Sequence, residues 1–316
     1  MNEILSVREL TYAFGQKKAV DGLSFSAGEG EIIGLLGPNG AGKTTTIRLM
    51  NCLYAPQPGW ISVYGYDPAT NGAEIRQISG VLTETPALYE RLTARQNLEF
   101  FGALADLPPV DLKTRADALL KDFELADRAN EPVSNYSKGM KQRLALARTL
   151  IADPKLLFLD EPTAGLDPEA SQQVHAMIEE ISARKNRTVL LCTHNLYEAE
   201  RLCDRLVIIH AGQLLAFGTL DELRQTLGGG VRVEFVFENP WRQDFLPAFD
   251  GQIEAKWGDD THLELRLADS RHIPDILSWF VSQNVRLLAC VPHQPSLEEV
   301  YFTLQQQVKE GRHEAQ

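Results

Sequence analysis

The chain has 316 residues, of which 44% are hydrophobic and 23% charged, a composition normal for a globular protein of about two domains. Its formal net charge of -12 disfavours non-specific attraction to nucleic acid or to an anionic membrane surface, because both carry negative charge. The four cysteines are scattered without a Cys-x-x-Cys pair, so neither a disulfide framework nor a zinc site is indicated.

Apolar runs such as residues 189–192 and 206–209 are short, whereas a membrane-spanning helix needs roughly 20 apolar residues. We therefore expect that the chain does not cross a membrane by itself. The first residues also lack the basic stretch, apolar core and cleavage site of a secretory signal, which predicts a cytoplasmic protein.

Residues 1–227 predict alternating strands and helices, the pattern of an α/β domain with a largely parallel sheet. The first buried strand is expected at residues 31–36, followed by a glycine loop and a helix over about residues 43–51. Apolar residues at helical spacing between residues 93 and 127 then predict an inserted helical subdomain, placed at about residues 85–150.

Two more apolar strands are expected at residues 156–159 and 188–192, and each ends directly at polar or charged residues. A hairpin at residues 206–217 and a short helix begun by a Thr219-x-x-Glu222 capping box follow. The run Gly228-Gly229-Gly230 predicts a flexible joint and a domain boundary.

The remainder predicts a small α+β domain over residues 231–305. Residues 231–238 and 262–267 alternate apolar and polar residues as strands do, and residues 273–281 read as a helix. A polar tail is expected over residues 306–316.

The strongest motif is the phosphate-binding pattern G-x-x-x-x-G-K-[ST] at residues 37–44, set between a predicted strand and a predicted helix. Glycines let backbone N–H groups wrap phosphates, Lys43 reaches the β and γ phosphates, and the Thr44 hydroxyl can ligate magnesium. Nucleotide contacts are therefore expected from Gly37, Pro38, Asn39, Gly40, Ala41, Gly42, Lys43, Thr44 and Thr45.

Two acids, Asp160 and Glu161, stand at the exit of an apolar strand, where a buried sheet delivers side chains to the ligand crevice. Asp160 would hold hydrated magnesium and Glu161 would polarise the attacking water. The pair could instead simply cap the next segment. His194 follows another strand end, and a lone histidine of this kind gains meaning only in company.

The segment Tyr-Ser-Lys-Gly-Met-Lys-Gln-Arg at residues 136–143 resembles the signature loop of ATP-binding-cassette (ABC) ATPases. The order of motifs is similar to that family over residues 4–227. Phe14 stands where the family has its adenine-stacking aromatic residue, residues 164–167 resemble its dimer-contact loop, and His194 its γ-phosphate histidine.

The resemblance implies a P-loop NTPase core of ABC ATPase type that binds ATP and Mg²⁺ and acts as a head-to-tail homodimer. It implies that Ser137 and Gly139 of one copy contact the nucleotide bound to the other. The implied catalytic residues are Glu161, His194 and Glu84, and the implied magnesium ligands are Thr44, Glu84 and, through water, Asp160.

Two positions depart from the family pattern. The signature loop has Lys138 in place of its first glycine and Met140 in place of its glutamine, and the lysine charge could favour phosphate. Glu84 stands where the family has a glutamine, which adds negative charge near the γ-phosphate.

These variations, with residues 83–89 and 295–302, are similar to the ATPase subunits of two-component ABC exporters of the drug, sodium or antibiotic-efflux type. That resemblance implies a separate multispanning permease chain, attachment to the cytoplasmic face of the membrane through it, and no nucleic-acid partner. Packing alone also explains the apolar face of the last helix, formed by Leu297, Val300, Tyr301 and Leu304.

Two other functions remain open. A soluble ABC ATPase acting on ribosomes or DNA is one, although a single P-loop and no metal-ligand cluster or sustained heptads argue against it. A module that senses ATP without hydrolysing it is the other, and phosphate release from the purified protein would separate it from an ATPase.

Overall fold

The computed structural model describes residues 3–57, 60–226, 230–242, 249 and 251–313, which fall into two compact units, Met1–Thr219 and Leu220–Gln316. A six-stranded sheet runs through the first unit, parallel except for its last strand. In spatial order its strands are β5 (Ser79–Leu82), β6 (Leu156–Asp160), β7 (Thr188–Thr193), β3 (Ile32–Leu36), β8 (Arg205–His210) and β9 (Gln213–Gly218).

The central strands are buried on both faces, which is why they appear in the sequence as continuous apolar runs. Successive side chains of β6 enter two different cores because strand residues alternate between faces. Leu157 and Leu159 pack in a core with the helical segments, whereas Leu156 and Phe158 pack in a core with a second sheet.

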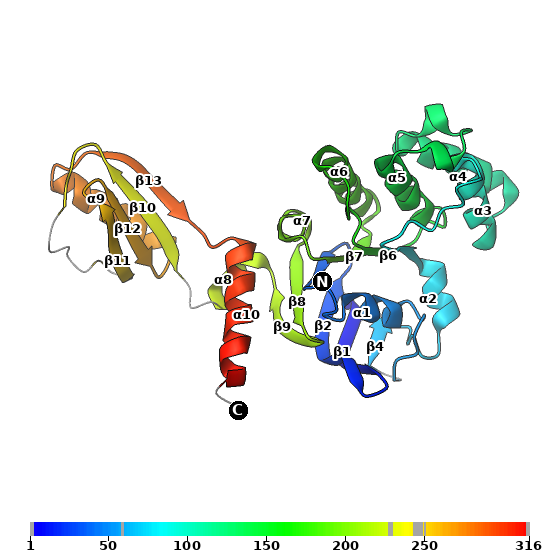
Figure 1. Cartoon of the computed structure of the whole chain (residues 1–316), viewed down its shortest axis with the longest axis horizontal. Coiled ribbons are helices and arrows are strands. Elements are labelled where there is room, and N and C mark those ends of the chain that lie inside the picture. The colour runs from blue at the N-terminus through cyan, green and yellow to red at the C-terminus, as the bar shows by residue number, and fades with distance from the viewer. Residues whose placement is uncertain (1–2, 58–59, 227–229, 243–248, 250, 314–316) are drawn as a thin grey trace. The chain divides into compact units, whose positions relative to one another are not determined.

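Helices cover the two faces of the central sheet (Figure 1). One face carries α5 and α6, and α1 lies on the other, beside the second sheet. The helices of this unit are α1 (Lys43–Met50), α2 (Gly72–Ile78), α3 (Ala94–Leu104), α4 (Pro109–Asp122), α5 (Lys138–Thr149), α6 (Pro168–Lys185) and α7 (Leu196–Leu202), with single 3₁₀ turns at Ala126–Arg128 and Val133–Asn135.

The expected helix-rich stretch consists of α3, α4 and α5. A complete capping box begins α3, since the Thr93 side chain accepts from the Gln96 N–H and the Gln96 side chain accepts from the Thr93 N–H. Ser137 caps the N-terminus of α5, because its hydroxyl accepts from the Met140 N–H. The first turn of α5 therefore coincides with the segment that resembles a signature loop.

A second, antiparallel sheet was not anticipated by the sequence analysis. It consists of β1 (Glu3–Phe14), β2 (Lys17–Gly28) and β4 (Ile61–Val63), in the order β2-β1-β4. Several register shifts between β1 and β2 interrupt the period-two pattern that would have marked these strands. The sheet matters for function because it brings the start of the chain against the phosphate-binding loop.

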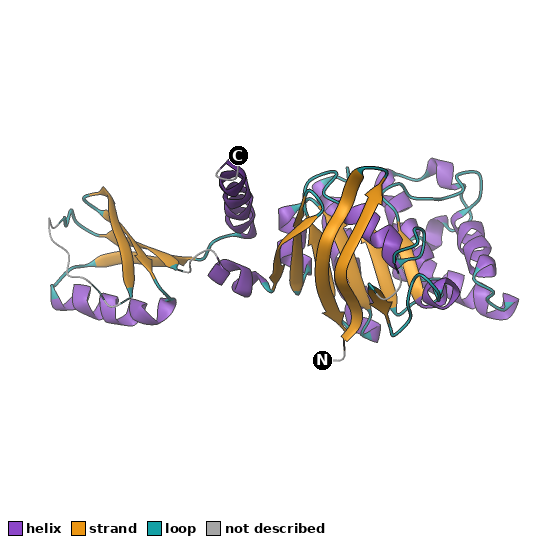
Figure 2. Cartoon of the chain, turned by 90° about the horizontal axis from the view of Figure 1, so that it is seen from below, coloured by secondary structure: helices purple, strands orange, loops and turns teal. Residues whose placement is uncertain are grey.

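The second unit holds a four-stranded antiparallel sheet in the order β11-β12-β10-β13, and Figure 2 shows α9 along one face of it. Buried residues of β10, β12 and α9 form its core, including Phe235, Phe237 and Phe280. Its elements are α8 (Leu220–Thr226), β10 (Val231–Phe237), β11 (Gln252–Asp259), β12 (His262–Leu267), a 3₁₀ turn (Ser270–His272), α9 (Ile273–Ser282), β13 (Leu287–His293) and α10 (Leu297–His313).

The two units divide between Thr219 and Leu220, earlier than the expected joint at residues 228–230. The reason is that α8 belongs with the second unit: Arg224 Nε donates to the Pro295 carbonyl at 2.7 Å, just before α10. Gly228 and Gly229 lie outside the described residues. Helix α10 continues to His313, so most of the segment expected as a polar tail is helical.

Candidate functional site

The phosphate-binding loop lies between β3 and α1, as its motif requires. Gly42 caps α1 with a φ of 108°, and a Cβ on it would lie 2.5 Å from the Ala19 carbonyl oxygen of β2. Only glycine fits both the backbone conformation and this close approach. The loop therefore presents its N–H groups at the positive end of α1, an arrangement that binds anions.

Lys43 and Thr44 begin α1 and point to the same acidic centre. Lys43 is 6% exposed, and its ammonium donates to the carbonyls of Gly37 at 2.7 Å and Pro38 at 3.3 Å. The same ammonium lies 3.7 Å from Glu161 Oε1. Thr44 Oγ1 donates to Asp160 Oδ2 at 3.0 Å. The loop and the acidic pair, far apart in the sequence, are therefore one site.

The acidic pair is held by neighbouring strands of the parallel sheet. Asp160 ends β6 opposite Cys192 of β7, and the Glu161 N–H donates to the Cys192 carbonyl at 2.8 Å. Glu161 has a φ of 51°, uncommon for a residue with a side chain, and it turns the chain away from the sheet. His194 Nδ1 lies 2.8 Å from Glu161 Oε1, so His194 belongs to the same site as the acidic pair.

Burial raises the pKa of the Asp160 carboxyl above its ordinary value, and the charges of Glu161 and Glu84 act in the same direction. The hydrogen bond from Thr44 and the positive charge of Lys43 oppose this rise. Asp160, Glu161 and Glu84 all line one cleft, and a divalent cation there would offset part of their negative charge.

Phe14, at the end of β1, is 49% exposed and packs edge-to-face against Tyr12 and Tyr54. Its ring stands beside the phosphate-binding loop, in a cleft of about 570 Å³ whose size suits a small-molecule ligand. The cleft is lined by Phe14, Lys17, Lys18, Ala19, Asn39, Gly40, Ala41, Gly42, Lys43, Thr44, Thr45, Glu84, Asp160, Glu161, Ala164, His194 and Ala211.

Lys17 and Lys18 are the charged cleft residues that the sequence analysis did not name. They begin β2, directly after the turn that follows Phe14. Lys18 is paired with Asp21 at 2.8 Å. The available signal was a basic pair shortly after Phe14. It indicates a place in the cleft only once β1 and β2 are known to form a hairpin.

The signature segment lies elsewhere. Among the described residues that line the cleft, neither Ser137 nor Gly139 occurs. The Lys138 ammonium donates to the Gly165 carbonyl of the same chain at 2.9 Å. One chain therefore brings together the phosphate loop and the acids but leaves Ser137 and Gly139 apart from them.

The donors at the acidic centre fit Mg²⁺. This ion is commonly held by one or two carboxylates together with phosphate oxygens and water, and the Thr44 hydroxyl and Asp160 carboxylate already lie within 3.0 Å of each other. The described residues hold no group of three His, Cys, Asp or Glu side chains suited to an all-protein metal cage. The site is thus suited to a metal that arrives with phosphate.

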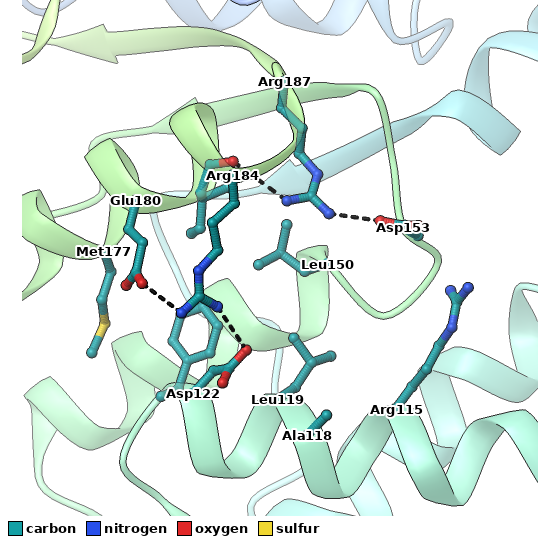
Figure 3. A pocket seen from close by; sticks show the side chains of 12 residues that line it. Arg115, Ala118, Leu119, Asp122, Leu150, Asp153, Met177, Glu180, Arg184 and Arg187 are labelled. Carbon is teal, nitrogen blue, oxygen red and sulfur yellow. Dashed lines mark hydrogen bonds and ion pairs between the residues drawn. The ribbon is translucent and has the colours of Figure 1, made fainter.

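A smaller cavity of about 220 Å³ lies between α4 and α6 in the first unit (Figure 3). Its floor is apolar, and most of its charged rim is paired: Arg184 with Asp122 and Glu180, and Arg187 with Asp153 at 2.6 Å. The pair between Arg184 and Asp122 links α6 to α4. The cavity shows no constellation for chemistry.

Comparison with known proteins identifies the family. Residues 20–164 match the family model described as ABC transporter. The chain is 43% identical over 299 residues to the daunorubicin resistance ATP-binding protein DrrA2 of Streptomyces coeruleorubidus, covering 92% of this chain and 91% of that protein. It is 41% identical over 227 residues to the fluoroquinolones export ATP-binding protein Rv2688c of Mycobacterium tuberculosis (strain ATCC 25618 / H37Rv), covering 70% and 73%.

A solved structure described as the ATP binding subunit of an ABC transporter is also similar. It has a TM-score of 0.64 and 36% identity, and the match covers 71% of this chain and 93% of that one. The predicted fold class, with its helical subdomain and extra C-terminal sheet, is confirmed. The chain belongs to the family of ABC transporter ATP-binding proteins, and it is an ABC ATPase.

Proposed function

We propose that this chain energises a separate membrane permease, as part of an exporter, by ATP-driven closure of a homodimer. One observation carries the proposal. The cleft holds the phosphate loop, Asp160, Glu161 and His194, whereas Ser137 and Gly139 of the same chain lie outside it. A second copy can complete the site by presenting its own Ser137 and Gly139.

The proposal gives the predicted cleft residues the following roles. Lys43 and the loop N–H groups hold the phosphates, and the Phe14 ring stacks on the adenine. Glu161 accepts a proton from the attacking water, and His194 beside it contacts the γ-phosphate. Thr44, Glu84 and Asp160, the last through water, would hold Mg²⁺, which neutralises phosphate charge when bound.

Supplying half of the site from a second copy links hydrolysis to dimer closure. Phosphoryl transfer is catalysed chiefly by positioning and electrostatics, so a late-arriving Ser137 hydroxyl can switch the reaction on. Ser137 and the first N–H groups of α5 suit this task because they form a helix N-terminus, which favours anions. The free energy of ATP binding would then drive the closing movement of the two copies.

The segment from Glu84 to Arg91 is the part expected to pass this movement to the permease. It is held by α5, since Arg148 Nη1 donates to the Ala87 carbonyl at 2.6 Å and Lys141 pairs with Glu90 at 2.6 Å. Beside these contacts Tyr89 is exposed and packs on Phe100 at 4.9 Å between ring centroids. An exposed aromatic pair of this kind suits a protein partner.

Attachment to the cytoplasmic face of the membrane would come from the permease. No helix among the residues that the structure describes is long and apolar enough to span a bilayer. Two relatives are named for daunorubicin resistance and for fluoroquinolones export, which favours outward transport of drug-like molecules. The residues that select such a molecule would belong to the permease.

The test is to purify the tagged chain from detergent-solubilised membranes and to identify the proteins that accompany it. We expect one multispanning protein in near-equal amount. Replacing Tyr89 and Phe100 together by serine should remove it, whereas Phe302→Ser, at an exposed aromatic residue of α10, serves as the matched control and should retain it. Recovery of ribosomal or DNA-bound proteins in place of a membrane protein would contradict the proposal and favour a soluble ABC ATPase.

A further inference from the structure

The loop that follows Glu161 connects the acidic centre to α6 and includes residues 164–167, which resemble a dimer-contact loop. It is a tight turn: the Ala164 N–H donates to the Glu161 carbonyl at 3.1 Å. Gly165 has a φ of 65°, in the region that favours glycine. Any displacement of this loop therefore reaches Glu161 within a few residues.

Two side chains of α5 hold this loop by its backbone. Gln142 Nε2 donates to the Pro162 carbonyl at 2.6 Å, in a buried contact. Lys138 Nζ donates to the Gly165 carbonyl at 2.9 Å. Because Lys138 and Gln142 are four residues apart, they lie on the same side of the helix and act one turn apart. Both belong to α5, the helix that Ser137 caps.

The fit around Gly165 is specific to this contact. A Cβ on Gly165 would lie 2.2 Å from Lys138 Nζ, so a larger residue would displace the ammonium. The starts of α5 and α6 are also close, since a Cβ on Gly139 would lie 3.2 Å from the Ala170 Cβ. The Lys138 ammonium thus fits beside residue 165 only because that residue is glycine. At position 138 itself the family usually has glycine, which has no side chain to make this bond.

We propose that Lys138 is a positioning residue that, with Gln142, ties the loop after Glu161 to helix α5 of the same chain. Contact between Ser137 and the nucleotide of a second copy then acts on Glu161 of the first through two side-chain hydrogen bonds. The departure from the family's glycine strengthens communication between the two sites. This inference rests on the proposed homodimer.

A direct contact between Lys138 and the phosphate of the second copy's nucleotide is the competing role, and kinetics separate the two. A phosphate ligand contributes to ATP binding, so its loss raises KM and weakens ATP affinity. A positioning residue for Glu161 leaves binding intact and acts on turnover. Because Lys138 is exposed, its replacement should leave the fold unaffected.

The experiment compares full-length wild type with Lys138→Met, Lys138→Arg and Gly165→Ala, with Lys121→Met as a control at an exposed lysine of α4. We expect Lys138→Met to lower kcat about fivefold, the effect of one modest hydrogen bond, with ATP affinity changed less than about twofold. The arginine variant keeps a donor and should recover most of the rate. Cooperativity with respect to ATP should fall in parallel with kcat.

Gly165→Ala should displace the Lys138 ammonium, and because the positive φ of Gly165 also strains an alanine there, its loss of kcat should be at least as large as that of Lys138→Met. The double variant should be no slower than the worse single variant, because both changes break the same contact. Wild-type kcat in Lys138→Met, additive losses in the double variant, or a raised KM with unchanged kcat would each overturn the inference.

The failure of the proposed homodimer is recognised separately. ATP-dependent dimerisation is measured in Glu161→Gln, in which Lys138 is unchanged. No dimer there contradicts the proposed function and the transmission between copies together. A dimer that forms while Lys138→Met turns over at the wild-type rate contradicts only the positioning role.

Discussion

The two units of this chain treat charge in opposite ways. In the first unit Lys43 and Asp160 are almost fully buried around one cleft, and burial raises the pKa of Asp160. In the second unit the charges lie at the surface, and hydrogen bonds from the exposed Arg271 lower the pKa of Asp269 to about 2. The second unit keeps its interior for aromatic rings.

This difference locates the chemistry. Burying a charge is costly, so proteins retain one mainly where neighbours or a ligand compensate it. The first unit bears that cost around the phosphate loop, whereas the second gains stability from apolar packing and places no comparable constellation among its described residues. We infer that the second unit serves regulation or coupling and takes no part in hydrolysis.

Replacing Glu161 should produce the largest effect. Glu161→Gln keeps the size and one oxygen of the side chain but removes its capacity to accept a proton, so turnover should fall about a thousandfold. ATP binding should remain, because Lys43 and the loop N–H groups are untouched, and an ATP-bound dimer should accumulate. Phosphate release and sedimentation with ATP check both results. Turnover near the wild-type rate would exclude Glu161 as the base.

Glu84 should give the next largest effect and tests how far the cleft extends. Glu84→Gln retains an oxygen ligand while removing charge, so hydrolysis should persist or rise. Glu84→Ala removes the ligand, which should cost about a hundredfold in rate, or about 3 kcal/mol. ATPase rate and ATP affinity of both variants, measured with the permease present, decide the matter. Equal, near-wild-type rates in both would mean that Glu84 is a solvated loop residue.

The phosphate loop, the acidic pair and His194 line one cleft, and each could be located in the sequence because its pattern is local. Strands β3, β6 and β7 are buried on both faces and so appear as apolar runs, and the residues just beyond them are those that gather at the edge of the sheet. The P-loop pattern and the acidic pair needed no knowledge of distant contacts. Their positions therefore followed from strand ends alone.

What the sequence missed depends on pairing between distant segments. Strand β1 meets β2 with several register shifts, which hide its alternation, and the position of Lys17 follows from that hairpin. The contact between Lys138 and Gly165 joins residues 27 apart, through the packing of α5 beside α6. Arg224 of α8 donates to the Pro295 carbonyl, 71 residues further along the chain, and no local pattern indicates that contact.

The separation of the two units is tested most directly by a chain that ends at Thr219, where the structure divides them. Ending there removes α8 together with the rest of the second unit and leaves the cleft whole. We expect a cooperative thermal unfolding transition, with ATP affinity and kcat within about twofold of the full-length chain, the scatter typical of changes remote from a site. Loss of ATP binding in a truncated chain that still unfolds cooperatively would contradict the conclusion that the first unit carries the nucleotide chemistry by itself.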